Sequence, residues 1–383
     1  MNITITPGIL RGTVTAIPSK SQAHRLLICA AFADRPTTLI CRDTNQDIEA
    51  TAACLRALGA SIVRSEEGYT IIPCSRIPDT AVLPCKESGS TLRFLLPIVG
   101  ALGIDTTFQL EGRLPQRPLS PLWEEMERMG CTLTRPTANT LRCQGQLQSG
   151  EYTIAGNVSS QFISGLLFAH NLIEGCHLTV TGKLESKPYV DMTHAAIELF
   201  QGHHRRSPGT VTVEGDWSNG AFWLCAAALG SDLTVSGLAA DSLQGDRAIA
   251  DLLPQLCSGH TQISAADIPD LIPVLAVVAG AKHGAVFTDT QRLRLKESDR
   301  VASTIAMLEA LGGKVEATDD TLTVYATGYL GGTVDACGDH RIAMSAAIAA
   351  TVCSQPVTVL GAESVNKSYP HFWAEYRRLG GKL

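Results

Sequence analysis

Residues 55–63, LRALGASIV, have the pattern of a helix that ends on a glycine and leads directly into a strand. The pattern returns as MERMGCTLT at 126–134, LEALGGKVE at 308–316 and YRRLGGKL at 376–383. The glycines of the first two copies are 71 residues apart, and those of the last two are 68 apart. A repeat of about seventy residues therefore organises the chain.

The repeat can be described as a set of predicted elements. Starting at Ser19, an apolar-faced helix is followed by a short strand, a second helix and two strands around a turn. Counting the strand before Ser19, the unit is βαβαββ. The interval from Gly130 to Gly312, 182 residues, is too short for three full repeats. We therefore predict that the third and fourth repeats, which begin near Val158 and Trp217, are shortened.

Six repeats of this kind predict an α/β protein of two domains, three repeats in each, with helices buried inside sheets. The chain should cross between the domains near Pro18 and near Gly215. We expect residues 1–17 and 215–383 to form a first, discontinuous domain and residues 18–214 to form the second. Anion sites would then face a cleft between them.

Composition excludes several classes of protein. A net charge of −6 disfavours a nucleic-acid coat or a membrane-surface protein, and no apolar run is long enough to span a bilayer. The 12 cysteines are scattered singly, without metal-ligand spacing, so we expect reduced thiols, no metal and a cytoplasmic location. His203 and His204 fit an exposed turn better than a metal site.

Predicted helix starts in the first half of the chain carry hydroxyls and cations. Free backbone N–H groups and the helix dipole make such positions natural anion sites. Each hydroxyl alone is more often a simple helix cap, but the donors recur at equivalent points of successive repeats. The stretches are Ser19–Arg25, Gly89–Arg93, Val158–Gln161 and Glu185–Tyr189, together with the loop Gly112–Pro118.

The second half supplies carboxylates beside further cations, in Asp267–Asp270, Lys296–Arg300, Asp339–Arg341 and Lys367. Two plainer interpretations stay open here. Asp270 and Asp339 can be helix caps, and Glu297 with Arg300 can be an ordinary pair three residues apart on a helix.

Ten motifs now appear in order: SKSQAHR, SGSTLR, RLPQRP, VSSQF, SKPY, EGDWSNG, DIPD, LRLKESDR, GDHRIAM and NKSYP. Together they resemble the motif series of the 5-enolpyruvylshikimate-3-phosphate (EPSP) synthase family, from residue 19 to residue 370. The resemblance implies a two-domain inside-out α/β prism. It also implies transfer of the enolpyruvyl group of phosphoenolpyruvate to the 5-hydroxyl of shikimate 3-phosphate, through a tetrahedral intermediate, in aromatic amino acid biosynthesis.

The resemblance also implies roles for individual residues. The expected shikimate 3-phosphate ligands are Lys20, Ser21, Arg25, Ser159, Ser160, Gln161, Ser186, Tyr189, Asp270 and Lys296. The expected phosphoenolpyruvate ligands are Lys20, Gly89, Arg117, Gln161, Arg300, His340, Arg341 and Lys367. The expected catalytic residues are Asp270, which accepts the hydroxyl proton, Glu297, which exchanges a proton at the methylene carbon, and Lys20 and Lys367, which assist the leaving phosphate.

Further expectations follow from this resemblance. We expect no cofactor, no nucleic-acid or membrane partner, a monomer, domain closure on substrate, and inhibition by glyphosate because Gly89 leaves room at its helix start. Three alternatives differ in sequence. The sister family acting on a UDP-linked amino sugar would carry a cysteine within 113–118, and RNA 3′-phosphate cyclases would need a basic surface. A scaffold that binds anions without turnover would keep the pocket alone.

Overall fold

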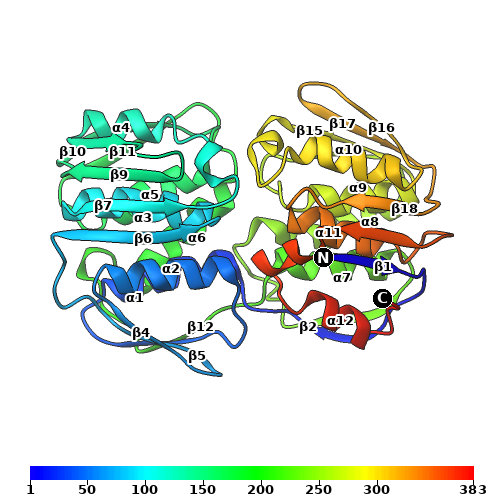
Figure 1. Cartoon of the computed structure of the whole chain (residues 1–383), viewed down its shortest axis with the longest axis horizontal. Coiled ribbons are helices and arrows are strands. Elements are labelled where there is room, and N and C mark those ends of the chain that lie inside the picture. Colours follow the sequence, from blue (N-terminus) through cyan, green and yellow to red (C-terminus); the bar gives the residue numbers. More distant parts are fainter. The chain divides into compact units, whose positions relative to one another are not determined.

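The computed structural model describes residues 1–383, which form two compact units. Met1–Ile17 and Gly215–Leu383 make up the terminal unit, and Pro18–Glu214 make up the central unit. Figure 1 marks both chain ends within the terminal unit. No helix of the chain combines the length and the apolar character needed to cross a membrane.

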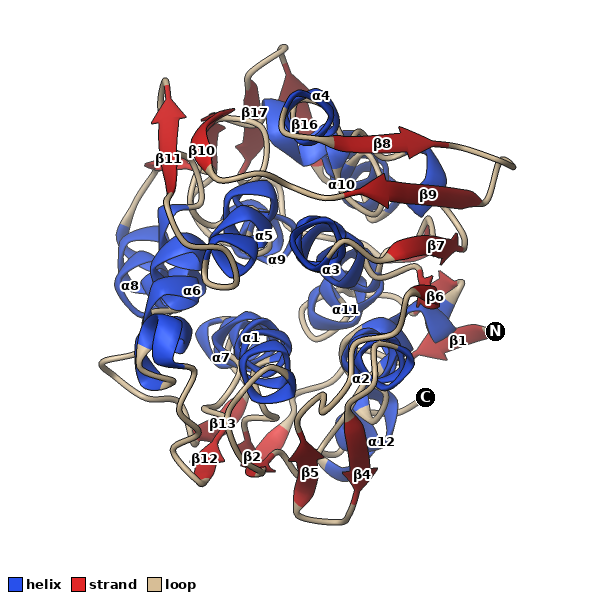
Figure 2. Cartoon of the chain, turned by 90° about the vertical axis from the view of Figure 1, so that its left-hand side faces the viewer, coloured by secondary structure: helices blue, strands red, loops and turns tan.

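The helices of the central unit lie inside its sheets. Figure 2 shows α1, α3, α5 and α6 almost end-on, with strands at the periphery. The helices are α1 (Lys20–Ala31), α2 (Gln46–Ala57), α3 (Gly89–Leu102), α4 (Leu122–Arg128), α5 (Ser160–His170) and α6 (Lys187–Leu199), with the 3-10 turns η1 (Leu114–Gln116) and η2 (Gly202–His204). In α3, 12 of the 14 residues are buried, as expected for a helix enclosed on all sides.

Three sheets surround these helices. Two have four strands, in the orders β12-β3-β5-β4 and β6-β7-β9-β8, and the third pairs only β10 with β11. The strands are β3 (Thr37–Ile40), β4 (Ser61–Arg64), β5 (Gly68–Ile72), β6 (Thr80–Lys86), β7 (Asp105–Leu110), β8 (Cys131–Thr134), β9 (Thr140–Gly145), β10 (Gly150–Ala155), β11 (Cys176–Thr181) and β12 (Thr210–Thr212). The chain therefore returns through β12, near its exit from the unit, to pair with β3 near its entry.

The terminal unit has the same kinds of element. Its helices are α7 (Trp217–Ala228), α8 (Ile249–Ser258), α9 (Ile272–Ala281), α10 (Arg300–Ala310), α11 (His340–Ala349) and α12 (Phe372–Arg378), with η3 (Gly245–Ala248), η4 (Gln291–Leu295) and η5 (Ala362–Lys367). All ten residues of α11 are buried, and so are nine of the ten in α9. Both helices are therefore core elements of this unit.

The sheets of the terminal unit contain four, three and two strands. Their orders are β14-β15-β17-β16, β1-β19-β18 and β13-β2. The strands are β1 (Asn2–Ile5), β2 (Arg11–Thr15), β13 (Asp232–Ser236), β14 (Thr261–Ser264), β15 (Ala285–Thr288), β16 (Lys314–Ala317), β17 (Thr321–Tyr325), β18 (Gly332–Asp335) and β19 (Val357–Leu360). The N-terminal strands β1 and β2 pair with β19 and β13, so sequence-distant segments complete the unit.

The glycine motif behaves as the sequence predicts. Gly59, Gly130, Gly312 and Gly380 all have positive φ, between 87° and 111°, which a residue without Cβ adopts at little cost. After the first three, a strand begins within two residues. After Gly380 the predicted strand is reduced to one bridge between Lys382 and Thr6.

Candidate active site

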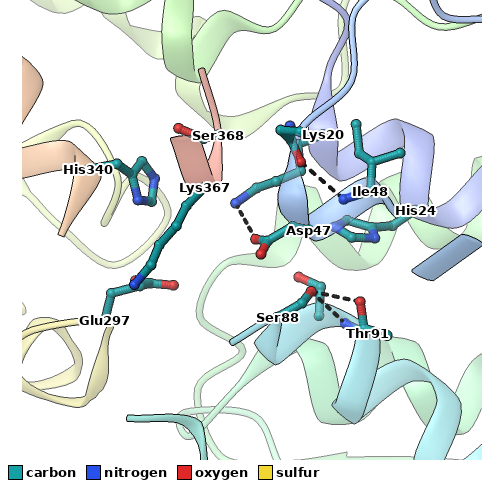
Figure 3. Close-up of polar contacts among 12 residues, drawn as sticks. Lys20, His24, Asp47, Ile48, Ser88, Thr91, Glu297, His340, Lys367 and Ser368 are labelled. Carbon is teal, nitrogen blue, oxygen red and sulfur yellow. Dashed lines mark hydrogen bonds and ion pairs between the residues drawn. The ribbon is translucent and has the colours of Figure 1, made fainter. Parts of the chain in front are cut away.

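Lys20 and Asp47 form an ion pair within the central unit. Ser19 caps α1, so Lys20 is the first helical residue, and its Nζ lies 3.0 Å from Asp47 Oδ2 on the first turn of α2 (Figure 3). Both side chains are mostly buried, at 17% and 16% exposed. The ammonium is thereby held at a helix N-terminus, where an anion is also favoured.

Arg25 ties the start of α1 to the start of α6. Its Nε donates to Thr193 Oγ1 at 2.9 Å, and its Nη2 donates to the Tyr189 carbonyl at 2.7 Å. Its Nη1 donates to the Ser21 carbonyl at 2.6 Å. Burial lowers the pKa of Arg25 to about 10, so the guanidinium still carries its charge at neutral pH.

A second set of contacts ties α3 to α5. Arg93 Nη1 donates to Gln161 Oε1 at 2.9 Å, and Gln161 Nε2 donates to Ser90 Oγ at 3.0 Å. Gly89 precedes them at the helix start. A Cβ on Gly89 would lie 2.7 Å from guanidinium nitrogens of both Arg93 and Arg117, so only glycine leaves these cations undisplaced.

The predicted phosphate-binding serines also lie at helix starts. Ser159 caps α5 and accepts from the Gln161 N–H at 3.3 Å, and the next residue, Ser160, is buried. Ser186 precedes α6 with φ of 56°, an uncommon conformation for a residue other than glycine. We call this group of helix starts the central cluster: Lys20, Ser21, Arg25, Gly89, Arg117, Ser159, Ser160, Gln161, Ser186 and Tyr189.

Arg300 is the hub of the terminal unit. Its side chain is 1% exposed, and each of its nitrogens contacts a different carboxylate. Nε donates to Asp339 Oδ2 at 2.9 Å and Nη2 to Glu297 Oε2 at 2.7 Å, while Nη1 pairs with Asp270. A guanidinium has five N–H hydrogens, so two remain after these three bonds.

Asp270 joins Arg300 to Arg341. Its Oδ2 lies 3.5 Å from Arg341 Nη2, and Arg341 Nη1 donates to the Ser218 carbonyl at 2.9 Å. Burial alone would raise the pKa of Asp270, but the charges of Arg300 and Arg341 outweigh burial and hold it well below its ordinary value. The alternative in which Asp270 caps a helix is wrong, because α9 begins at Ile272 and no side chain caps it.

Three further predicted residues belong to the terminal unit. Lys296 lies on the approach to α10, where burial lowers its pKa to about 8. His340 is buried at the start of α11, and Lys367 Nζ donates to the Gly338 carbonyl at 2.9 Å (Figure 3 shows both side chains). We call this group the terminal cluster: Asp270, Lys296, Glu297, Arg300, His340, Arg341 and Lys367.

Asp47 was not among the predicted site residues, and Arg93 and Asp339 appeared only within the predicted stretches Gly89–Arg93 and Asp339–Arg341. Asp339 does cap α11, accepting from the Arg341 N–H at 2.9 Å, but its other oxygen also holds Arg300. Arg93 ends the SGSTLR motif at one predicted helix start, and Asp47 stands at the start of the second predicted helix, outside every motif. That position was the available signal, whereas their partners lie 27 and 68 residues away in sequence.

The two clusters differ in charge. Cations dominate the central cluster, where Lys20, Arg25 and Arg117 stand near helix N-termini, so its chemistry is the binding of anions. The terminal cluster mixes carboxylates with cations and can therefore both hold an anion and exchange protons. The chain contains no group of three or more His, Cys, Asp or Glu residues arranged to hold a metal ion.

Solved structures share this fold over the whole chain. EPSP synthase from Acinetobacter baumannii matches with a TM-score of 0.81 and 23% identity, over 99% of this chain and 98% of that one. The enolpyruvyl transferase NikO from Streptomyces tendae matches with a TM-score of 0.74 and 21% identity, over 99% and 97%. The chain thus has the fold of the enolpyruvyl transferases.

Sequence comparison identifies the family to which the chain belongs among the enolpyruvyl transferases. A family profile described as EPSP synthase (3-phosphoshikimate 1-carboxyvinyltransferase) matches residues 5–376. The 3-phosphoshikimate 1-carboxyvinyltransferases of Clostridium kluyveri and Clostridium beijerinckii are 37% and 36% identical, over 100% and 99% of this chain and 98% of each relative. The chain belongs to the EPSP synthase family. The first alignment spans 417 positions against 383 residues here, so the relative carries extra residues inside the matched span.

Proposed function

We propose that the two clusters together carry out the reaction of this family. The chain transfers the enolpyruvyl group of phosphoenolpyruvate to shikimate 3-phosphate and releases phosphate. The observation that supports different roles for the two clusters is their difference in charge: the central cluster is cationic, whereas the terminal cluster contains both carboxylates and cations. Because phosphoenolpyruvate is assigned residues from both clusters, the proposal requires that both engage the same molecule, with closure of the two domains.

Shikimate 3-phosphate is assigned chiefly to the central cluster. Its phosphate would accept from the hydroxyls of Ser159, Ser160 and Ser186, two of which stand at or next to the N-cap of α5, where free N–H groups also favour an anion. Arg25 would keep the starts of α1 and α6 together around the ring, beside Ser21 and Tyr189. Gln161 would line the same pocket, and Lys20, Asp270 and Lys296 would reach the ring hydroxyls.

Phosphoenolpyruvate is assigned to both clusters. Its planar carboxylate matches the forks of Arg300 and Arg341, which can each donate two parallel hydrogen bonds. The two N–H hydrogens left on Arg300 are available for this contact. Its phosphate would lie against point charges and helix-start donors, namely Lys20, Gly89, Arg117, Gln161, His340 and Lys367.

Chemistry then follows by addition and elimination. The 5-hydroxyl oxygen bonds to C2 of phosphoenolpyruvate while Asp270 takes the hydroxyl proton and Glu297 delivers a proton to C3. Glu297 then removes a proton from C3 of the tetrahedral intermediate, the C2–O bond to phosphate breaks, and Lys20 and Lys367 stabilise the leaving phosphate. Exclusion of water by domain closure would protect the intermediate.

The strong pairing of Asp270 sets a condition on this scheme. With its pKa held low by Arg300 and Arg341, Asp270 is a weak base in the ligand-free chain. A substrate carboxylate on the two remaining N–H groups of Arg300 adds a negative charge beside Asp270 and shares the charge of the guanidinium, which raises the pKa of Asp270. Binding of phosphoenolpyruvate would therefore activate the base that its own reaction needs.

Finer features of fold and inhibition belong to the same proposal. We assign the six sheets to six βαβαββ-type repeats of an inside-out prism, the two-stranded sheets β10-β11 and β13-β2 marking the shortened third and fourth repeats. Glyphosate is the expected inhibitor, and the chain acts as a monomer without a cofactor.

Phosphate release tests the proposal. The purified chain is given phosphoenolpyruvate with shikimate 3-phosphate, or with UDP-N-acetylglucosamine as the acceptor of the sister family. Release with shikimate 3-phosphate alone is expected. Release only with the sugar nucleotide would move the chain to the sister reaction, and no release with either would leave an anion-binding protein.

A pair of variants tests the role of Glu297. Glu297→Gln should lower the rate by about 10²–10⁴-fold, the usual contribution of general acid–base catalysis, while calorimetry still detects shikimate 3-phosphate binding. Glu316→Gln, at an exposed carboxylate of the same unit, is the matched control and should keep full rate. An unchanged rate in Glu297→Gln would remove this residue from the mechanism.

A further inference from the structure

A buried hydrogen-bond chain crosses three helices of the central unit. His24 Nδ1 lies 2.7 Å from Thr51 Oγ1, Thr51 Oγ1 lies 2.6 Å from Thr91 Oγ1, and Thr91 Oγ1 donates to Ser88 Oγ at 2.7 Å. All four side chains have no exposed surface. We call His24, Thr51, Thr91 and Ser88 the buried chain; Figure 3 shows its members His24, Ser88 and Thr91.

Its hydrogens can be ordered in one direction only. Thr91 spends its single hydroxyl hydrogen on Ser88, so toward Thr51 it can only accept. Thr51 must then donate to Thr91 and accept from His24, which places the ring hydrogen on Nδ1. His24 Nε2 has no hydrogen-bond partner, so a hydrogen on it would be an unsatisfied buried donor, which the neutral ring with its hydrogen on Nδ1 avoids.

The surroundings of His24 agree with a neutral ring. Burial lowers the pKa of His24 well below its ordinary value, and the nearby charges of Lys20 and Arg25 lower it further. The ring packs edge-on against Phe94 of α3, with centroids 6.4 Å apart. A fixed tautomer in a packed site makes the buried chain a rigid link rather than a proton acceptor.

The buried chain connects two helix starts that carry proposed phosphoenolpyruvate ligands, those of α1 and α3. His24 lies one turn after Lys20 on α1, Thr51 lies one turn after Asp47 on α2, and Ser88 caps α3 immediately before Gly89. The Lys20–Asp47 ion pair joins α1 to α2, but the link onward to α3 runs through Thr51 and Thr91.

We infer that the buried chain is a positioning device that holds Lys20 and Gly89 at the spacing phosphoenolpyruvate requires. This inference rests on the proposed function, which identifies phosphoenolpyruvate as the ligand. None of its members touches substrate in the scheme above. Lys20 is assigned to both substrates, but Gly89, next to the Thr91–Ser88 end of the buried chain, is assigned to phosphoenolpyruvate alone. No member lies on α5 or α6, whose starts hold the phosphate of shikimate 3-phosphate. Breaking a hydrogen bond of the buried chain should therefore weaken the binding of phosphoenolpyruvate more than the binding of shikimate 3-phosphate.

Thr51→Val tests this separation, because valine keeps the shape of threonine and removes the hydroxyl. Loss of a buried hydrogen bond that leaves its partners unsatisfied predicts that KM for phosphoenolpyruvate rises about tenfold, with KM for shikimate 3-phosphate changed less than about twofold. Thr91→Val should do the same, and the double variant should add little, because either change breaks the same link. Thr106→Val is the matched control: Thr106 is equally buried in this unit and donates to the Ile104 carbonyl at 3.1 Å, outside the buried chain.

His24 gives a second readout that needs no turnover. In protein labelled with ¹⁵N-histidine, long-range ¹H–¹⁵N correlation spectra should show His24 with its hydrogen on Nδ1 and no titration around pH 6.5, where exposed histidines titrate. His24→Asn, which can keep an N–H donor toward Thr51, should preserve KM better than His24→Leu.

The outcomes separate the two proposals. A hydrogen on Nε2, or equal KM changes in Thr51→Val and Thr106→Val, would overturn the buried chain as a positioning device while the reaction stands. If the wild-type chain releases no phosphate, the proposed function fails. Calorimetric binding of phosphoenolpyruvate to the same variants then decides the positioning role, which falls if Thr51→Val binds as the wild type does.

Discussion

Asp339→Asn tests how the terminal cluster is held together. Asp339 is fully buried, accepts from Arg300 Nε and Ser298 Oγ through Oδ2, and caps α11 through Oδ1. Asparagine keeps the volume but removes the charge, so Arg300 loses one of its carboxylates inside the unit. Breaking a buried pair at one partner costs ~3–5 kcal/mol, and we expect the lower end, about 3 kcal/mol, because an oxygen acceptor remains.

Urea unfolding followed by tryptophan fluorescence measures this loss. Trp217, Trp223 and Trp373 lie in the terminal unit, against one tryptophan in the central unit, so the signal reports mainly on the unit that contains Asp339. With a slope of about 2 kcal/mol per molar urea, the midpoint should fall by about 1.5 M. Asp335→Asn, at an exposed carboxylate in the same segment, should shift it by less than about 0.5 M.

The contribution of Asp339 to folding stability depends on pH, and the shift of its pKa gives the direction of that dependence. Burial alone would raise the pKa of Asp339, but the charge of Arg300 outweighs it and holds the pKa below the ordinary value. Such a carboxylate stabilises the folded state above its unfolded pKa of about 3.9, and the contribution is lost as pH falls through the folded pKa. The wild type should exceed Asp339→Asn in stability from about pH 5 to 8, and the gap should close on acidification. Equal midpoints at pH 7 would refute the reasoning.

Three other predictions concern single side chains. Gly89→Ala should raise KM for phosphoenolpyruvate about tenfold in initial-rate assays, and should weaken inhibition by glyphosate, because the new Cβ displaces Arg117; unchanged constants would show that the helix start tolerates a side chain. Binding of shikimate 3-phosphate should weaken as pH rises through about 8, where Lys296 loses its charge, and calorimetry of Lys296→Arg should show this alkaline loss removed. Lys187→Ala should change the free energy of unfolding by less than about 1 kcal/mol, because its pair with Asp191 is exposed; a larger loss in thermal unfolding would contradict this.

Local sequence patterns predicted many of the helices and strands. Side chains that cap helices are local signals, and Ser19, Ser159 and Asp339 do cap α1, α5 and α11. The glycine that ends a helix and the strand that follows it are equally local signals, which is why the sequence predicted both after Gly59, Gly130 and Gly312. The reduction of the last strand to one bridge at Lys382 was not, because pairing depends on the partner strand.

Long-range pairing explains what the sequence could not supply. Asp270 stands in a segment that looks like a helix start, but its partners Arg300 and Arg341 lie 30 and 71 residues further along the chain. The strand β12 similarly pairs with β3, which precedes it by most of the central unit. Cap and period patterns describe neighbours within one or two helical turns, so such contacts fall outside them.

The pairing of β1 with β19 has a consequence for synthesis on the ribosome. Asn2 pairs with Leu360, so β1 cannot find its partner until β19, more than 350 residues later, has emerged. At ~5–20 residues per second, this wait lasts on the order of 20–70 s. The central unit, whose strands pair only with one another, can mature during that interval. β2 finds its partner β13 earlier, but the backbone N–H and C=O groups of β1 have no partner strand until β19 is made, which exposes β1 to pairing with other chains.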